Sequence, residues 1–102
     1  MTTAKNTAIL EGVRIIDLTS VVFGPLATQM LGDLGADVIK VEAPEGDLLR
    51  QVQPSNNKLM GAAFLGANRN KRSVVLDLKE RTGQDQLRKL LKDADVMISS
   101  IR

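Results

Sequence analysis

The side chains able to do chemistry in this sequence gather where four apolar runs end. Those ends are Thr19–Phe23, Glu42–Ala43, Asp77–Lys79 and Ser99–Ile101. If the runs are parallel strands, their carboxyl ends lie along one sheet edge, where open α/β sheets bind ligands. A helix that begins after the first run would direct free N–H groups and its positive dipole end at that edge. The pattern predicts a site for a phosphorylated ligand, to which Lys79 can add a positive charge; ordinary loop residues remain the alternative.

The residue types that are missing exclude several kinds of chemistry. The 102 residues include no His, Cys, Tyr or Trp, which excludes a histidine base, a tyrosine proton donor and a Cys/His zinc site within them. A net charge of +2 and two Phe residues are too little for a nucleic-acid surface. No apolar run reaches the roughly 18 residues of a membrane span. Asp17 and Asp33 are expected to be structural or exposed, and the lack of cysteine fits a cytoplasmic protein.

The first half of the chain has the pattern of a strand, a helix and a second strand. Residues 13–18, VRIIDL, are β-branched and apolar and predict a buried strand, and residues 36–42, ADVIKVE, predict another. Between them, Pro25 suits the first position of a helix and Gly35 suits its end. This helix has an apolar face that is expected to pack in the core, formed by Leu26, Met30, Leu31 and Leu34.

The second half is expected to repeat the pattern after a long connection over residues 43–60. Residues 73–78, SVVLDL, predict a third strand, and DVMISSI, from Asp95, predicts a fourth. Thr82 and Asp85 resemble a capping box at the start of the helix between them. The core face of that helix is formed by Leu87, Leu90, Leu91 and Ala94. The whole pattern predicts an α/β fold, a Rossmann-like half with a mainly parallel open sheet ordered β-α-β-loop-β-α-β.

A nicotinamide cofactor is one ligand that such a sheet edge can hold. Glu42 stands where a dinucleotide-binding fold places its ribose-binding acid. However, the first turn, TSVVFGP, has one glycine in place of the three that let a pyrophosphate approach. Val21, Val22 and Phe23 also crowd this turn. The sequence therefore disfavours NAD.

Three separated blocks of the sequence carry a resemblance to a known family. They are LEGVRIIDLTSVVFGPLATQMLGDLGADVIKVEAPEGD, NRNKRSVVLDLK and ADVMISSIR, and they extend from about Leu10 to Arg102. In this order they resemble the start of the class III CoA-transferases, of the formyl-CoA and carnitine type, a family with acyl-CoA racemase relatives. The resemblance implies that residues 1–102 are a single N-terminal, Rossmann-like CoA-binding segment of a longer enzyme.

The resemblance also implies which residues contact coenzyme A. Those positions are Val22, Phe23, Ala43, Leu76, Asp77, Leu78, Lys79, Ser100, Ile101 and Arg102. They coincide with the sheet edge that the strand pattern predicts independently. Two positions depart from the family pattern. Relatives often have a basic residue in place of Ala43, and Glu-Asn-Phe in place of Ser99, Ser100 and Ile101.

The family's reaction moves CoA between an acyl-CoA and a small carboxylic acid without a metal. An aspartate takes the acyl group as a mixed anhydride and then CoA as an aspartyl thioester, and no residue here corresponds to it. We therefore expect the 102-residue chain to have no catalytic residue and to be inactive alone. The family's interlocked subunits imply a homodimer. A racemase, a stand-alone nucleotide- or CoA-binding module and a purely structural fragment remain alternatives.

Overall fold

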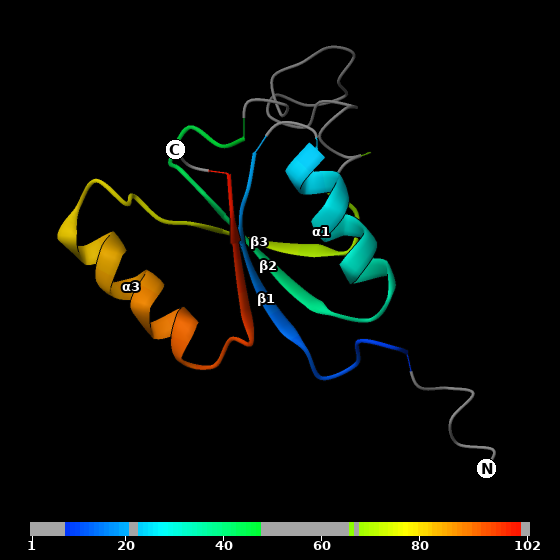
Figure 1. Cartoon of the computed structure of the whole chain (residues 1–102). Coiled ribbons are helices and arrows are strands. Elements are labelled where there is room, and N and C mark those ends of the chain that lie inside the picture. Colours follow the sequence, from blue (N-terminus) through cyan, green and yellow to red (C-terminus); the bar gives the residue numbers. More distant parts are fainter. Residues whose placement is uncertain (1–7, 21–22, 48–65, 67, 101–102) are drawn as a thin grey trace.

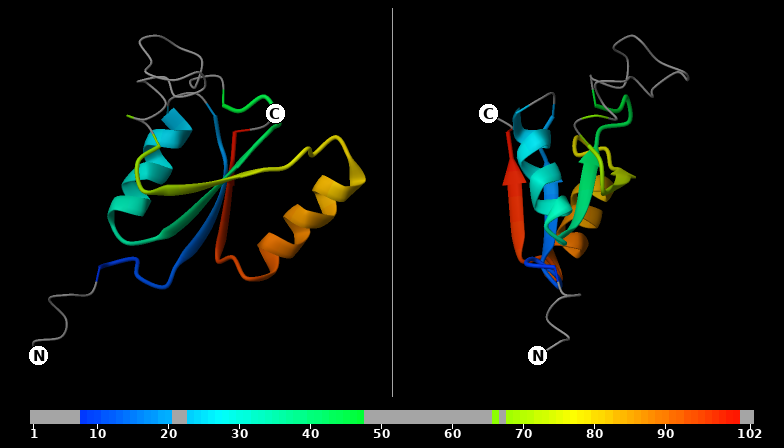
Figure 2. Two further views of the ribbon diagram at one scale, coloured as in Figure 1. Left: turned by 180° about the vertical axis from the view of Figure 1, so that it is seen from behind. Right: turned by 90° about the vertical axis from the view of Figure 1, so that its right-hand side faces the viewer.

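The computed structural model describes residues 8–20, 23–47, 66 and 68–100. In these residues all strand pairs are parallel, and the sheet has the order β3-β2-β1-β4. Helix α1 lies over one face of the sheet and α3 over the other (Figures 1 and 2). The elements are β1 (Arg14–Leu18), α1 (Phe23–Asp33), β2 (Asp37–Glu42), β3 (Lys71–Val75), α3 (Arg81–Lys92) and β4 (Val96–Ser99). The predicted α/β fold with a parallel open sheet is confirmed.

The end of α1 is fixed by glycine, as predicted. Gly35 has a φ of 107°, in the left-handed region that residues with a side chain rarely adopt. The N–H of Gly35 donates to the carbonyl of Gly32 at 3.0 Å, and that of Ala36 donates to Leu31 at 3.1 Å. This pair of bonds closes the last helical turn and satisfies carbonyls that the helix leaves open. The chain therefore enters β2 at a defined angle.

The face of the sheet under α3 is apolar. Its buried residues are Ile16, Ile39, Val41 and Leu76. Leu87, Leu90 and Leu91, predicted for the core face of α3, pack against them, and so does Ala94, which follows the end of the helix. This confirms the predicted core face of that helix. None of the helices in the described part of the chain is long and apolar enough to cross a membrane.

The face of the sheet under α1 changes character along the strands. Near the amino ends, Ile15, Ala36 and Val38 form a small buried apolar cluster. Toward the carboxyl ends the buried side chains on the same face are charged, because alternate residues of a strand share a face. These charged residues are Asp17 on β1 and Lys40 and Glu42 on β2. The part of this face near the carboxyl ends of the strands is therefore held together by polar contacts.

The apolar face predicted for α1 is wrong for three of its four residues. Only Leu31 packs against the buried cluster, whereas Leu26, Met30 and Leu34 are 36%, 66% and 43% exposed. The helix instead buries Pro25, Thr28 and Gln29. The Thr28 hydroxyl donates to Asp17 at 2.7 Å. Because the sheet presents a buried carboxylate to α1, a polar side of the helix faces it.

The third strand and the start of α3 also differ from the predictions. β3 is Lys71–Val75 and not 73–78, because its partner β2 ends at Glu42, which pairs with Val75. The residues after Val75 lead to α3. The N-cap of α3 is Glu80, without a side-chain capping bond, so the predicted capping box at Thr82 is not formed. Most of the predicted connection 43–60 lies outside the described residues.

Gly83 lets α3 approach the segment after β3 closely. This close approach predicts that a single added methyl group lowers the stability of the protein. A Cβ at Gly83 would clash with the backbone carbonyl of Asp77. We expect Gly83→Ala to lower the free energy of unfolding by about 1–3 kcal/mol, as overpacking does. That loss exceeds the gain of about 1 kcal/mol in helix propensity. Urea unfolding measures the change.

Gln86→Ala is the matched control, because it adds alanine to an exposed position of the same helix. It should leave the free energy of unfolding within about 0.5 kcal/mol of the wild type. A Gly83→Ala variant that is as stable as the wild type would contradict the close packing of α3 on Asp77.

Candidate functional site

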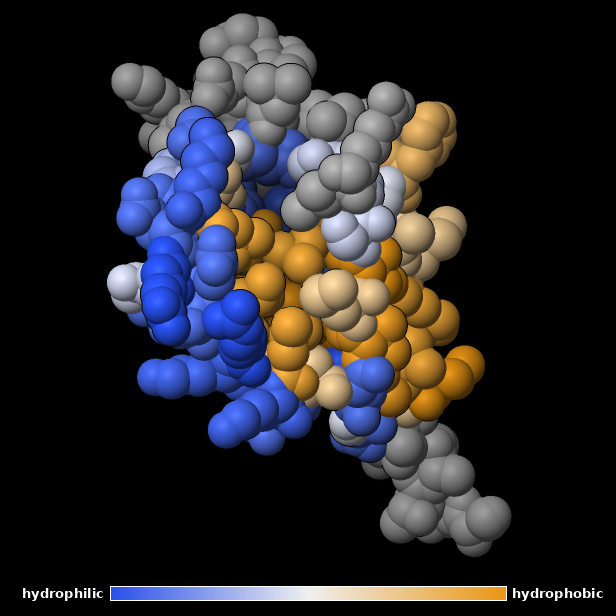
Figure 3. Space-filling model, turned by 60° about the vertical axis from the view of Figure 1, so that its left-hand side comes forward, coloured by the Kyte–Doolittle hydropathy of each residue, from blue (hydrophilic) through white to orange (hydrophobic). Residues whose placement is uncertain are grey.

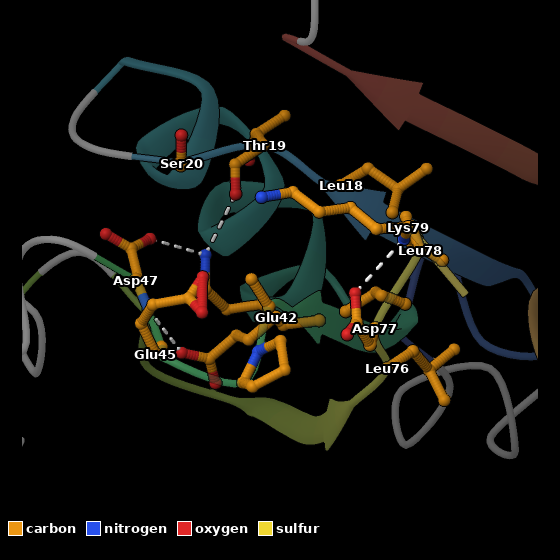
Figure 4. A pocket seen from close by; sticks show the side chains of 15 residues that line it. Leu18, Thr19, Ser20, Glu42, Glu45, Asp47, Leu76, Asp77, Leu78 and Lys79 are labelled. Atoms are coloured by element: carbon orange, nitrogen blue, oxygen red, sulfur yellow. Dashed lines mark hydrogen bonds and ion pairs between the residues drawn. The ribbon is translucent and has the colours of Figure 1, made fainter. Parts of the chain in front are cut away.

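A pocket of about 480 Å³ lies at the carboxyl edge of the sheet (Figure 4). Three segments form its walls: the end of β1, the end of β2 with the turn after it, and the segment between β3 and α3. The lining residues are Leu18, Thr19 and Ser20, then residues 40–47, then Leu76, Asp77, Leu78 and Lys79. The pocket is therefore at the edge where the strand pattern predicted a ligand.

Lys40 joins two of these walls. Its Nζ atom donates to the carbonyl of Thr19 at 3.0 Å and forms an ion pair with Asp47 at 2.9 Å. The Lys40 and Asp47 side chains are each 1% exposed. Removing one partner of a buried ion pair leaves an uncompensated charge and typically costs about 3–5 kcal/mol. The pair therefore fixes the turn after β2 against the end of β1.

The turn itself is held by Glu42. One Glu42 carboxylate oxygen accepts from the backbone N–H of Asp47 at 2.8 Å, and the other accepts from the Ser73 hydroxyl. Within the turn, the Gly46 N–H donates to Ala43 at 2.8 Å, and Gly46 has a φ of 82°. Because both carboxylate oxygens of Glu42 are engaged within the protein, the site does not present Glu42 to a ribose as the NAD alternative requires.

Lys79 is the cation that faces the pocket. Its side chain extends across the pocket toward Thr19 (Figure 4), and the residue is exposed. Its backbone N–H donates to Asp77 at 3.1 Å, which fixes the loop that carries it. Among the described residues its ammonium group has no ion pair. Lys79 is thus available to a ligand anion, whereas Lys40 already has a buried carboxylate.

Asp17 is a buried carboxylate on β1 that does not line the pocket. It accepts from the Thr19 N–H at 2.9 Å and from the Thr28 hydroxyl at 2.7 Å, and it forms an ion pair with Lys71 at 2.9 Å. Burial by itself raises the pKa of Asp17, but the hydrogen bonds from Thr19, Lys71 and Thr28 outweigh it, so the pKa is lowered. Asp17 is therefore ionised and fully engaged, as expected for a structural carboxylate.

Asp33, which the sequence also predicted to be structural or exposed, lies at the end of α1. It accepts from the Arg69 guanidinium at 2.7 Å and from the Asn70 amide at 2.6 Å. The hydrogen bond from Arg69 lowers the pKa of Asp33. Asp33 does not line the pocket.

Comparison with known proteins gives the family. Residues 10–102 match the model of a family described as CoA-transferase family III. The chain belongs to CoA-transferase family III. It is 43% identical over 94 residues to the formyl-CoA:oxalate CoA-transferase of Streptomyces avermitilis, covering 92% of this chain and 23% of that protein. It is 46% identical over 100 residues to the succinate–glutarate CoA-transferase of Agrobacterium fabrum, covering 91% and 25%.

Solved structures agree with this assignment. A CAIB/BAIF family protein from Brucella suis superposes with a TM-score of 0.86 at 39% identity, over 92% of this chain and 26% of that one. A hypothetical protein from Mycobacterium tuberculosis gives a TM-score of 0.84 at 45% identity, over 94% and 26%. The chain thus spans about a quarter of the length of the relatives it matches.

The CoA-contact positions implied by the family resemblance divide into three groups. Ala43 and residues 76–79 all line the pocket. Phe23 and Ser100 do not line it: Phe23 is the first residue of α1 and is 88% exposed, and the Ser100 hydroxyl accepts from the N–H of Ser20 at 3.3 Å. Val22, Ile101 and Arg102 lie outside the described residues.

The sequence analysis did not single out several pocket residues, and these include both partners of the buried ion pair, Lys40 and Asp47. Lys40 is the one charge between apolar residues in DVIKVE, which marks either a solvent-facing position or a buried, paired one. Period-2 alternation alone does not distinguish these two cases. Asp47 follows Gly46 in a turn, where an Asp is common for local reasons. No feature of the sequence indicated that the two side chains meet.

Asp17 gives a prediction for the dependence of stability on pH. Its pKa in the folded protein is below the ordinary value of 3.8. The stabilisation from its ionised form is therefore present above about pH 4 and is lost as the pH falls through the folded pKa. Asp17→Asn should cost about 3–5 kcal/mol at pH 7, because Lys71 is left buried without its partner. The difference between the wild type and the variant should shrink below about pH 4.

Urea unfolding from pH 7 to pH 2.5 measures this difference. Asp85→Asn on the exposed face of α3 is the control, because its ion pair with Arg88 is exposed and such pairs contribute little. A gap between the wild type and Asp17→Asn that stays constant down to pH 2.5 would contradict the lowered pKa of Asp17.

Proposed function

We propose that this chain binds the CoA portion of a CoA thioester in the pocket at the carboxyl edge of the sheet. The observation that carries the proposal is that five implied CoA-contact positions, Ala43 and residues 76–79, line one pocket. They come from segments more than thirty positions apart in the sequence and are adjacent only in the fold. The membership of the chain in CoA-transferase family III supports CoA as the ligand.

The recognition chemistry that we propose centres on Lys79 and the apolar walls. The Lys79 ammonium would pair with a phosphate of CoA, since charge-assisted bonds to phosphate are strong. Leu76 is buried and Leu78 half-buried on the same segment, offering apolar surface. The pocket volume of about 480 Å³ lies within the range of small-molecule sites. Of the acids in the lining, Asp47 is paired with the Lys40 ammonium group, and Glu42 accepts hydrogen bonds from Asp47 and Ser73.

We further propose that the segment serves a CoA-transferase that moves CoA between an acyl-CoA and a small carboxylic acid. An aspartate outside these 102 residues attacks the thioester carbonyl, which gives a mixed anhydride and releases the CoA thiolate. The thiolate then attacks the aspartyl carbonyl, releases the first carboxylic acid and leaves an aspartyl-CoA thioester. The second acid accepts the CoA by the reverse of these steps. In this scheme the 102-residue chain holds CoA while the CoA thiolate is free.

Calorimetric titration tests the binding proposal. The 102-residue chain should bind CoA in preference to NAD. Lys79→Ala should weaken CoA binding by about 1–3 kcal/mol, the loss expected for a charged hydrogen-bond partner. This loss corresponds to roughly 5- to 150-fold in the dissociation constant. Lys89→Ala, on the exposed surface of α3, is the control and should leave the affinity unchanged.

Two results would count against the proposal in different ways. Unchanged affinity in Lys79→Ala would remove Lys79 from the site while leaving the pocket as the binding region. The absence of any CoA binding by the folded wild type would overturn the proposed function. An assay for CoA transfer should find the 102-residue chain inactive, and turnover by this chain would contradict the proposed location of the nucleophile.

We also propose a homodimer, as the family resemblance implies. Support comes from apolar side chains at the surface of α1 and β4: Phe23 is 88% exposed, Met30 66% and Met97 51%. Figure 3 shows an apolar area on one side of the molecule. Exposed apolar patches mark interaction surfaces. Sedimentation equilibrium should show a dimer, and a monomer at every concentration tested would contradict this proposal.

A further inference from the structure

We propose that Lys40 is a positioning residue of the pocket, which sets the spacing between the end of β1 and the turn after β2. Its role is to hold two walls at the separation a ligand requires, without touching the ligand itself. The part of this inference that concerns ligand affinity rests on the proposed function, because CoA is the ligand used to measure it. The part that concerns the walls rests on the contacts of Lys40 alone.

The contacts of Lys40 reach both walls from one atom. Its Nζ donates to the Thr19 carbonyl at 3.0 Å and pairs with the Asp47 carboxylate at 2.9 Å. Thr19 follows β1 and Asp47 ends the turn after β2, and both residues line the pocket. Figure 4 draws these two contacts as dashed lines that reach Thr19 and Asp47. A single buried ammonium group therefore links the two segments.

Asp47 is a firm anchor for this link because its backbone is also held. Its N–H donates to Glu42 at 2.8 Å, and Glu42 belongs to the same strand as Lys40. The side chain and the backbone of Asp47 are thus both tied to β2 residues. The turn cannot move as a unit without breaking a buried charge contact and a hydrogen bond to a carboxylate.

A direct role of Lys40 in binding a ligand phosphate is less consistent with these contacts. The side chain is 1% exposed, and so is that of its partner Asp47. A phosphate would have to displace a buried carboxylate to reach the ammonium group, which the cost of breaking buried pairs opposes. Lys79 faces the same pocket and is exposed. In this proposal Lys79 binds the ligand, and Lys40 holds the two pocket walls in position.

A second buried lysine provides a matched control. Lys71 pairs with Asp17 at 2.9 Å, and these side chains are 2% and 0% exposed. This pair lies on the same face of the sheet, but neither Lys71 nor Asp17 lines the pocket. Lys40→Met and Lys71→Met each leave one buried carboxylate without its lysine. If Lys40 were merely structural, the two variants would behave alike.

The experiment compares CoA affinity by calorimetry with thermal stability in the wild type and both Met variants. We expect both variants to lose stability, but only Lys40→Met to weaken CoA binding, by about tenfold or more. Lys71→Met should change the affinity by less than about twofold. Hydrogen exchange at the Gly46 and Asp47 amides should speed up in Lys40→Met and stay slow in Lys71→Met.

A double variant keeps the test decisive if Lys40→Met does not fold. Lys40→Met combined with Asp47→Leu removes both charges, so the penalty for an unpaired buried charge disappears. It should be more stable than Lys40→Met and still bind CoA about tenfold more weakly than the wild type. Wild-type affinity in the double variant, or equal losses of affinity in Lys40→Met and Lys71→Met, would overturn the inference.

The proposed function and this inference fail in different ways. If the wild type binds no CoA, the proposed function is wrong. In that case faster exchange at Gly46 and Asp47 in Lys40→Met alone would still support the positioning role. If the wild type binds CoA and exchange at these amides is unchanged in Lys40→Met, the positioning role is wrong and the proposed function stands.

Discussion

The structure depends on the burial of charge beneath α1. Asp17 and Lys40 lie opposite each other in the β1–β2 register, and both side chains are almost completely removed from water. Charges in such a place must have partners, because desolvation of an unpaired ion costs several kcal/mol. Lys71 supplies the partner of Asp17, and Asp47 supplies that of Lys40. Lys71 lies on β3 and Asp47 ends the turn after β2, so the two ion pairs tie both segments to this face of the sheet.

Because of this constraint, the two faces of the sheet are stabilised by different interactions. The face under α3 is an apolar core and contributes hydrophobic stabilisation along its whole length. The opposite face is less apolar toward the carboxyl ends of the strands. There, hydrogen bonds and ion pairs hold the loops in place. The pocket is at this end of the sheet. The least apolar part of the interior is thus adjacent to the site, as expected where binding groups must be fixed in position.

Much of the fold could be predicted from local sequence signals. β-branched runs located the strands, and Gly35 located the end of α1 because only glycine tolerates its φ. Apolar periodicity identified the core face of α3 correctly. The same reasoning failed for α1, because periodicity shows which residues are apolar but not what they face, and the sheet presents Asp17 there. The end of β3 was missed since it is set by where β2 ends.

The sequence predicted that the site lies at the sheet edge, but it did not predict the contacts among the side chains there. The strand pattern placed Asp77–Lys79 at the edge, and the family resemblance added Leu76. Their adjacency to Ala43 follows from the parallel topology. The Lys40–Asp47 pair depends on two side chains meeting across a turn, which no spacing rule encodes. The folded backbone decides which lysine meets which carboxylate, and one sequence does not reveal it.

The most direct test of CoA binding at this edge is an NMR titration of the ¹⁵N-labelled chain with CoA. We expect the amide shifts that change most to cluster at Thr19, Ser20, residue 43, residues 45–47 and residues 76–79, and to fit a one-to-one complex with CoA. Changes confined to α3 or to the amino ends of the strands, or no changes at all, would contradict binding in this pocket.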